Sequence, residues 1–328
     1  LNYYKSFNFL KKKYSNMYFK ISLIELCYSE EILKNKLMGD NDYLFMTKYI
    51  NVNEYDNFKK ICKHFKKENI IYLQYESPYK LSRNWMEETF FNDVGIIVGN
   101  YLKNNKIKKN SIWTPARSLA ISIFDFNKYI INDLNFDKLI VINPFSHKGH
   151  TCINSLKFNL SRLELVKKLI NIKPNIDVYG RHFIKKEFPH NWISTIGTKG
   201  GGLDYGISKI NKLAEYKFII TIENNFVDGY ITEKLSDVLL CNRVIIYFGS
   251  PNIENIMPNL FPNGAINGFN FDTLDDLIIF IDNMSDEEYF KRINIIKKER
   301  DTILQLFNFE NHLSYLITKI LERKGLKI

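Results

Sequence analysis

The stretch YKFIITIENNFVDGYITEKLSDVLLCNRVIIYFGSPNI, residues 216–253, carries the clearest secondary-structure pattern of the chain. It contains two apolar, β-branched runs, at residues 218–224 and 244–249, and a helical pattern that begins near Thr232 between them. Short apolar runs that alternate with longer helical patterns are typical of βα units around a parallel sheet. The stretch therefore predicts one strand–helix–strand unit of an α/β protein.

The same alternation extends along the rest of the chain. Further strands are expected at residues 70–75, 94–99, 139–145 and 176–180, and further helices at residues 54–67 and from near Ser161, Leu274 and Asp286. Two sheets fit this pattern better than one, with a boundary near Asn135. We therefore predict a first Rossmann-like domain at residues 1–135, a nucleotide-binding Rossmann-like domain at 136–305 and a helical segment at 306–328. Packing of that last segment on the first domain is left open.

Composition places the chain among globular proteins. Of its 328 residues, 45% are hydrophobic and 25% are charged, and no apolar run is long enough to cross a bilayer. The first residues lack the apolar core of a signal peptide. The four cysteines form no CxxC pair, which disfavours zinc and a dense disulfide framework. We expect a reducing compartment, with a cytoplasmic or peripheral membrane location.

The charge balance points to anionic partners. Lys and Arg total 46 against 36 Asp and Glu, a formal net charge of +10. Nucleic acid, a membrane surface or a nucleotide sugar would each suit such a charge. The lysine clusters are scattered, and neither an RNA-recognition signature nor a zinc-finger spacing is present, so no nucleic-acid partner is expected. A peripheral membrane contact is left open.

Polar residues follow the first strand of the opening stretch. Glu223 and Asn224 end that strand, and Glu233 and Lys234 fall in the first turn of the helix that Thr232 would cap. Polar side chains at the carboxyl end of a strand, facing a helix start, form the usual ligand crevice of an open α/β sheet. Exposed backbone N–H groups there would favour an anion. An ordinary solvated helix start is the alternative reading of the Glu-Lys pair.

The order of these residues resembles the signature of the alpha-1,3/4-fucosyltransferases, which use GDP-fucose. The matching elements are Tyr216-Lys217-Phe218, Glu223-Asn224, Gly229-Tyr230-Ile231-Thr232-Glu233-Lys234 and Gly249-Ser250-Pro251-Asn252-Ile253. Asn225 departs from the family, which often has Ser or Thr there. The resemblance implies a GT-B fold, in which two Rossmann-like domains with parallel sheets face a central cleft. It also implies that Lys234 neutralises the pyrophosphate, that Glu233 accepts hydrogen bonds from the ribose hydroxyls, and that Asn224 and Tyr230 complete the pocket.

Two further segments resemble the same family. FNLSRLELVKKLINIKPNIDVYGR, residues 158–181, places Arg162 at the family's phosphate-binding arginine, which implies bidentate recognition of the β-phosphate. IIYLQYESPYKLSRNW, residues 70–85, places Glu76 in an ESP-like element, where the family's proposed general base lies. The segment GTKGGGLDYG, residues 197–206, resembles a glycine-rich turn, and a surface loop is its equally good reading.

Metal ligands are not expected. His147 and His150 have no third ligand at a suitable spacing, and Asp40-Asn41-Asp42 has the DxD form of metal-dependent transferases without a preceding strand. We interpret the histidines as part of a polar loop and the DxD as a turn. The expected enzyme therefore needs no metal and no other cofactor.

These observations together predict an inverting glycosyltransferase. It would transfer fucose from GDP-fucose to a hydroxyl of a glycan, in the family commonly one that contains N-acetylglucosamine. Glu76 would take the acceptor proton while Arg162 and Lys234 stabilise the leaving nucleoside diphosphate. Two alternatives stay open: a GT-B enzyme with another nucleotide sugar, and a catalytically silent glycan-binding relative. The acceptor, its linkage and the oligomeric state are not predicted.

Overall fold

The structure is a computed structural model that forms two compact units. The residues it describes are 44–46, 59–60, 62–63, 65–74, 96–99, 111–113, 130–145, 158, 160–180, 185–194 and 203–307, with residues 318 and 322. Leu1–Thr114 and Leu313–Ile328 belong to one unit, and Pro115–His312 belong to the other. This division follows contacts within the chain, and the domain limits at 135 and 305 stay predictions from the sequence.

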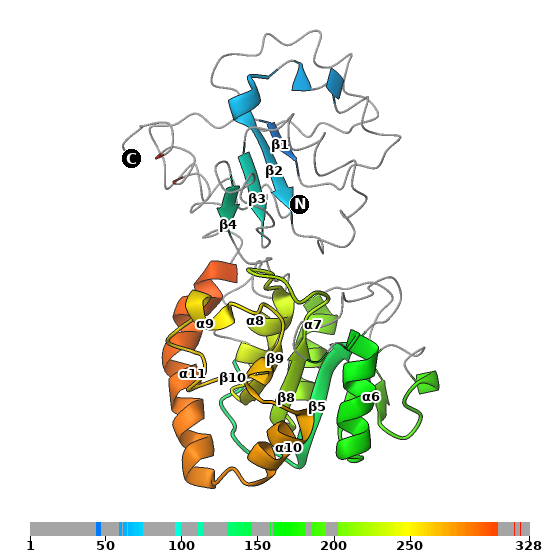
Figure 1. The fold of residues 1–328 in the computed structure, drawn as a ribbon. Helices are drawn as coiled ribbons and strands as arrows, with labels where there is room; N and C mark the ends of the chain where they lie inside the picture. The colour runs from blue at the N-terminus through cyan, green and yellow to red at the C-terminus, as the bar shows by residue number, and fades with distance from the viewer. Residues whose placement is uncertain are drawn as a thin grey trace. The chain divides into compact units, whose positions relative to one another are not determined.

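The first unit contains a parallel sheet. Its strands are β1 (Leu44–Met46), β2 (Ile70–Gln74), β3 (Ile96–Gly99) and β4 (Ser111–Trp113), in the order β1-β2-β3-β4. A 3-10 helix, η2 (Lys67–Asn69), precedes β2 (Figure 1). The predicted strands at 70–75 and 94–99 are confirmed as β2 and β3, whereas β1 and β4 were not expected.

The second unit contains a larger parallel sheet, which confirms the predicted α/β class. Its strands are β5 (Lys138–Phe145), β6 (Asp177–Gly180), β7 (Trp192–Ser194), β8 (Tyr216–Ile222), β9 (Val244–Phe248) and β10 (Ile266–Asn267). Their order is β10-β9-β8-β5-β6-β7, with every neighbouring pair parallel. All of β9 and nearly all of β8 are buried, as expected for strands covered on both faces.

Helices flank this sheet (Figure 1). They are α6 (Arg162–Ile172), α7 (Leu203–Leu213), α8 (Glu233–Leu239), α9 (Ile253–Ile256), α10 (Leu274–Asp282) and α11 (Asp286–Phe307), with a 3-10 helix, η6 (Gly268–Asn270). The predicted starts of α6, α8, α10 and α11 are confirmed. Capping explains three of them, because Ser161, Thr232 and Thr273 each accept a hydrogen bond from a backbone N–H of the first turn.

One predicted loop is wrong in part. The segment 197–206 is predicted to be a glycine-rich turn or a surface loop, but α7 begins at Leu203, and residues 197–202 lie outside the described part of the chain. Leu203, Ile207, Ile210 and Leu213 recur at helical spacing. This apolar stripe outweighs the cost of about 1 kcal/mol for a glycine within a helix.

Buried side chains hold the second unit together. Tyr289 of α11 packs edge-on against Phe218 of β8, with ring centroids 5.6 Å apart. Arg243, 1% exposed, donates to the carbonyl oxygens of Asn135 at 2.7 Å and Ala214 at 2.6 Å, and so fixes the segment that leads into β5. Among the described residues, no helix has the length and apolar character that a bilayer crossing requires.

Candidate functional site

The candidate site lies where β8 ends and α8 begins. Glu223 and Asn224 follow the last residue of β8, and Thr232 caps α8, whose first residues are Glu233 and Lys234. The carboxyl ends of parallel strands lie at one edge of a sheet, which is where open α/β proteins bind ligands. The predicted location of these residues at a strand end and a helix start is confirmed.

Glu223 closes the loop between β8 and α8. Its side chain is fully buried and accepts hydrogen bonds from the Thr232 N–H at 2.8 Å and the Thr232 hydroxyl at 2.7 Å. The Lys234 ammonium lies 3.7 Å from the Glu223 carboxyl. Burial raises the pKa of Glu223, and the neighbouring ammonium only partly opposes that effect. Glu223 is therefore a structural anchor of the loop, a role that the sequence did not assign.

Lys234 supplies the positive charge at this helix start. Its ammonium is 3.2 Å from the Thr232 hydroxyl and 3.2 Å from the Glu233 carboxylate, and its side chain is 12% exposed. Two of the backbone N–H groups that were expected to attract an anion here are engaged within the protein. The Thr232 N–H already donates to Glu223, and the Lys234 N–H donates to the Thr232 hydroxyl. An anion at this point would meet the ammonium of Lys234.

Glu233 presents an ionised carboxylate beside Lys234. Its side chain is 45% exposed. Desolvation acts to raise the pKa of Glu233. The positive charges of Lys234 and Lys209 lower this pKa by more than desolvation raises it, so the pKa lies below its ordinary value. Lys209 of α7 is itself buried in an ion pair with Asp237 of α8. A carboxylate that stays charged at neutral pH can accept hydrogen bonds from two hydroxyl groups.

Arg162 and Asn224 meet at the same strand end. The guanidinium of Arg162 donates from Nη1 to the Asn224 Oδ1 at 2.8 Å, and Arg162 is 3% exposed. A capping box between Ser161 and Glu164 fixes the start of α6 and therefore the backbone of Arg162. The structure thus brings together two predicted residues that are 62 positions apart in the sequence.

Tyr230 belongs to the packing of the loop. It is 2% exposed, and its carbonyl oxygen accepts a hydrogen bond from the Tyr247 hydroxyl at 3.3 Å. Nearby, Gly229 has a φ of 77°, in the region that favours glycine. Its N–H donates to Ser250 at 2.7 Å and to Asn252 at 3.0 Å. Ser250 and Asn252, in the GSPN element that follows β9, therefore hold this loop in place by hydrogen bonds.

Other predicted residues lie outside the described part of the chain. These are Glu76, Asp40, Asp42, His147 and His150. The assignment of Glu76 as a base therefore stays a prediction, as do the readings of the DxD and the two histidines. Within the described residues, no group of three or more His, Cys, Asp or Glu side chains is placed to hold a metal ion.

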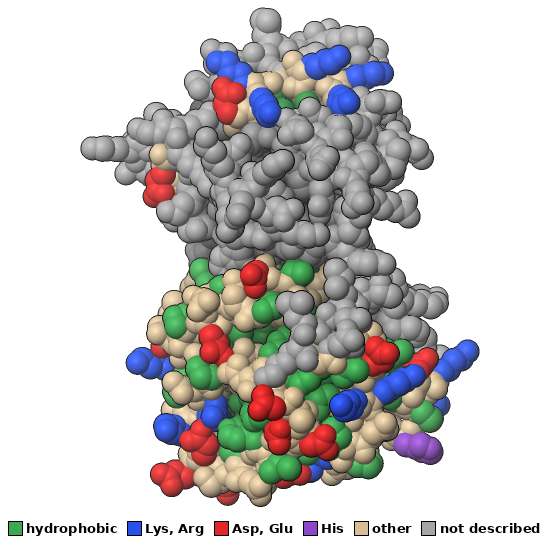
Figure 2. Space-filling view, in the orientation of Figure 1, with side chains coloured by type: hydrophobic (Ala, Val, Ile, Leu, Met, Phe, Trp, Pro, Cys, Tyr) green, Lys and Arg blue, Asp and Glu red, His purple; other side chains and the backbone are tan. Residues whose placement is uncertain are grey.

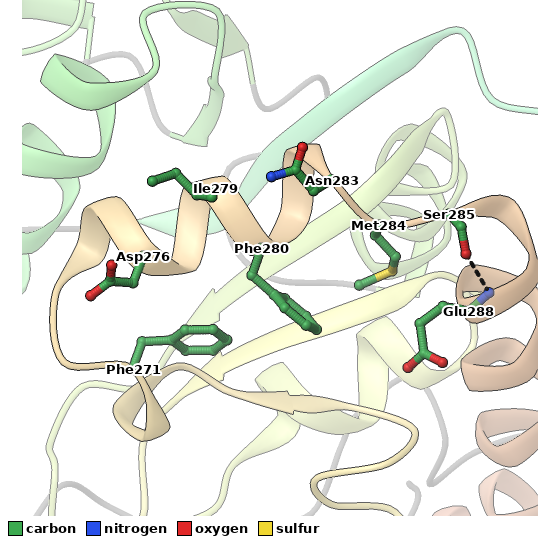
Figure 3. A pocket seen from close by; sticks show the side chains of 8 residues that line it. All are labelled: Phe271, Asp276, Ile279, Phe280, Asn283, Met284, Ser285 and Glu288. Atoms are coloured by element: carbon green, nitrogen blue, oxygen red, sulfur yellow. Dashed lines mark hydrogen bonds between the residues drawn. The ribbon is translucent and has the colours of Figure 1, made fainter.

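A pocket of about 560 Å³ lies apart from these residues, between α10 and the start of α11 (Figure 3). Its lining consists of Phe271, Asp276, Ile279, Phe280, Asn283, Met284, Ser285 and Glu288. Lys217, near the amino end of β8, forms an ion pair with Asp286 of α11 at 2.9 Å. The pocket therefore lies near the amino ends of the strands, whereas Glu223 lies at their carboxyl ends. Over α10, Figure 2 shows acidic side chains among hydrophobic ones, which does not suit an anionic ligand.

The sequence is similar to that of known fucosyltransferases over part of its length. Residues 147–312, just over half of the chain, match the model of glycosyltransferase family 10 (fucosyltransferase) C-term. An alpha-(1,4)-fucosyltransferase of Arabidopsis thaliana is 35% identical over 75 residues, which cover 23% of this chain and 18% of that protein. GDP-fucose protein O-fucosyltransferase 3 of Xenopus tropicalis is 51% identical over 47 residues, 14% of this chain and 10% of that protein. The matches thus span under a fifth of these relatives.

The fold has counterparts among solved structures. An alpha,alpha-trehalose-phosphate synthase (UDP-forming) from Burkholderia vietnamiensis superposes with a TM-score of 0.52 and 8% identity, covering 90% of this chain and 78% of that one. At this identity the likeness concerns the fold alone, and it confirms the predicted GT-B class.

The family model covers every described residue of the candidate site at the end of β8, from Arg162 to Lys234. The chain therefore belongs to glycosyltransferase family 10, the fucosyltransferase family.

Proposed function

We propose that this protein transfers fucose from GDP-fucose to a hydroxyl of a glycan, with inversion at the anomeric carbon. The observation that carries the proposal is the ammonium of Lys234, held at the carboxyl end of β8 by Thr232 and Glu233. It lies within the segment that matches the fucosyltransferase family. The name of the Xenopus tropicalis relative supports GDP-fucose as the donor.

The donor would be held by charge and by hydrogen bonds. Lys234 and Arg162 would bind the diphosphate, and the Glu233 carboxylate would accept hydrogen bonds from the ribose hydroxyls. When the diphosphate binds, it would replace Glu233 as the partner of the Lys234 ammonium, which leaves Glu233 available to the ribose. Asn224, whose Oδ1 orients the Arg162 guanidinium, and Tyr230, which is buried within the loop, would complete this pocket.

The chemical step would need a base and a means to stabilise the leaving group. Glu76 would accept the proton of the acceptor hydroxyl as that oxygen attacks the anomeric carbon. The two cations would stabilise the charge that develops on the GDP leaving group, the part that a divalent metal plays in other transferases. We therefore propose that no metal is essential and expect activity to survive excess EDTA. Loss of turnover in EDTA with recovery in Mg²⁺ or Mn²⁺ would contradict this part.

Calorimetry with GDP, UDP and guanosine tests the donor site. We expect GDP to bind more tightly than UDP or guanosine. Lys234→Met should weaken GDP binding at least about tenfold, because a charge-assisted hydrogen bond contributes roughly 1.5 to 3 kcal/mol. Lys291→Met is the matched control, since Lys291 lies on α11 and its side chain is 71% exposed.

The outcomes separate the alternatives. Tighter binding of UDP would favour another nucleotide sugar as the donor. Absence of binding of either nucleotide would favour a catalytically silent relative. Equal GDP affinity in Lys234→Met and Lys291→Met would remove Lys234 from the donor site.

A further inference from the structure

Asn143 joins three elements next to the candidate site. It lies in β5, is 2% exposed, and donates from Nδ2 to the Thr221 hydroxyl of β8 at 3.2 Å. The same nitrogen donates to the backbone carbonyl oxygen of Lys234 at 3.2 Å. A carbonyl oxygen can only accept, so this contact fixes which end of the amide faces α8. Asn143 therefore ties the first turn of α8 to the sheet.

The backbone around Asn143 is irregular. The register between β5 and β6 shifts between Ile142 and Phe145, the interval that holds Asn143 and Pro144. Proline donates no backbone hydrogen bond, and inside a central strand it is confined to such irregularities. A bulge redirects the side chain beside it, and bulges are frequent next to functional sites. The irregularity lies beside Asn143, which follows the apolar residues 139–142 of β5.

The two ends of the Asn143 amide differ in their surroundings. Its Oδ1 is buried and has no hydrogen-bond donor among the residues that the structure describes. A buried acceptor without a donor is destabilising, and an apolar side chain of similar size would avoid that cost. The two hydrogen bonds from Nδ2 are what such a side chain could not provide.

We propose that Asn143 is a positioning residue for donor binding. By holding the carbonyl of Lys234, it fixes the start of α8 so that the Lys234 ammonium faces the phosphates of the donor. This inference rests on the proposed function, in which Lys234 binds the diphosphate. Asn143 itself would act through Lys234, and its effect should depend on the phosphates of the ligand.

Calorimetry on two variants tests this role. Asn143→Ala removes both hydrogen bonds, whereas Thr221→Val removes only the one within the sheet and is the matched control. We expect Asn143→Ala to weaken GDP binding at least about fivefold, as for the loss of one positioning hydrogen bond, and to leave guanosine binding within about twofold. Thr221→Val should leave GDP binding within about twofold. Thermal unfolding of each variant establishes that it is folded.

A double-variant comparison separates positioning from a general structural effect. In a Lys234→Met background, Asn143→Ala should cause no further loss of GDP affinity. The inference would be overturned if Asn143→Ala binds GDP normally, or if Thr221→Val loses as much GDP affinity as Asn143→Ala does. It would also be overturned if Asn143→Ala causes the same loss of GDP affinity in the Lys234→Met background as in the unaltered protein. If Asn143→Ala does not fold, Asn143→Ser takes its place with the same expectations. Failure of the unaltered protein to bind GDP would overturn the proposed function and this inference together, whereas normal GDP binding with an unaffected Asn143→Ala overturns the inference alone.

Discussion

Replacement of Arg162 by Met tests the phosphate site at a second cation. Arg162 is 3% exposed, and its guanidinium donates to Asn224 at 2.8 Å at the end of β8. Methionine keeps the apolar stem of the side chain and removes only the charged group. A hydrogen bond to a charged group contributes roughly 1.5 to 3 kcal/mol, so GDP should bind about 10- to 150-fold more weakly.

Calorimetry with GDP and guanosine measures this loss. The matched control is Lys167→Met, which removes the same charge from the same helix, where Lys167 is 49% exposed and pairs with Glu187. Surface ion pairs contribute about 0 to 1 kcal/mol, so this control should bind GDP normally. If Arg162→Met binds GDP as tightly as the control does, Arg162 does not bind the phosphates. A parallel loss of guanosine binding and thermal stability would show that Arg162 supports the fold and not the phosphate.

Three further predictions concern stability, catalysis and pH. Lys209→Met should lower the free energy of unfolding, measured in urea, by about 3 to 5 kcal/mol, because it leaves Asp237 charged and buried. Adding Asp237→Leu to this variant should restore most of the lost stability. A loss below about 1 kcal/mol in Lys209→Met would contradict the prediction. Glu76→Gln should lower kcat by about 10²- to 10⁴-fold while the GDP dissociation constant stays unchanged, and a near-normal kcat would remove Glu76 from the base role. Burial raises the pKa of the Cys241 thiol to about 12, so at about pH 8 it should stay protonated and resist alkylation in the folded protein, as mass spectrometry of the labelled peptides would show. The stability linked to this thiol is fully present below its ordinary pKa and is lost as pH rises from that value to about 12. Native labelling as fast as in urea would contradict the assignment.

The sequence predicts the sheet of the second unit well because its signals are local. The apolar runs of β8 and β9 are long enough to distinguish strands from helices, and Ser161 and Thr232 are capping residues next to helical patterns. Strands of three residues, such as β1 and β7, carry too few positions to show a period. The start of α7 was missed because its glycines suggested a turn.

The sequence predicts only those parts of the site whose residues belong to a local motif. The TEK tripeptide places Glu233 and Lys234 at a helix start from sequence alone. The contact of Arg162 with Asn224 joins positions far apart in the chain and was not predicted, because the resemblance only placed each of them at the donor pocket. Nothing local indicates that Asn143 holds Lys234, because that bond depends on how β5 and α8 pack. The one available signal was an Asn-Pro pair inside an otherwise apolar strand.

An assay of sugar transfer distinguishes a fucosyltransferase from the alternatives. The unaltered protein would be incubated in EDTA with an N-acetylglucosamine-containing glycan and, in separate reactions, GDP-fucose, GDP-mannose or UDP-glucose. Mass spectrometry of the glycan would then show which sugar had been added. We predict addition of one deoxyhexose from GDP-fucose and no addition from the other two donors, whereas transfer from UDP-glucose, or no transfer from GDP-fucose, would contradict the account.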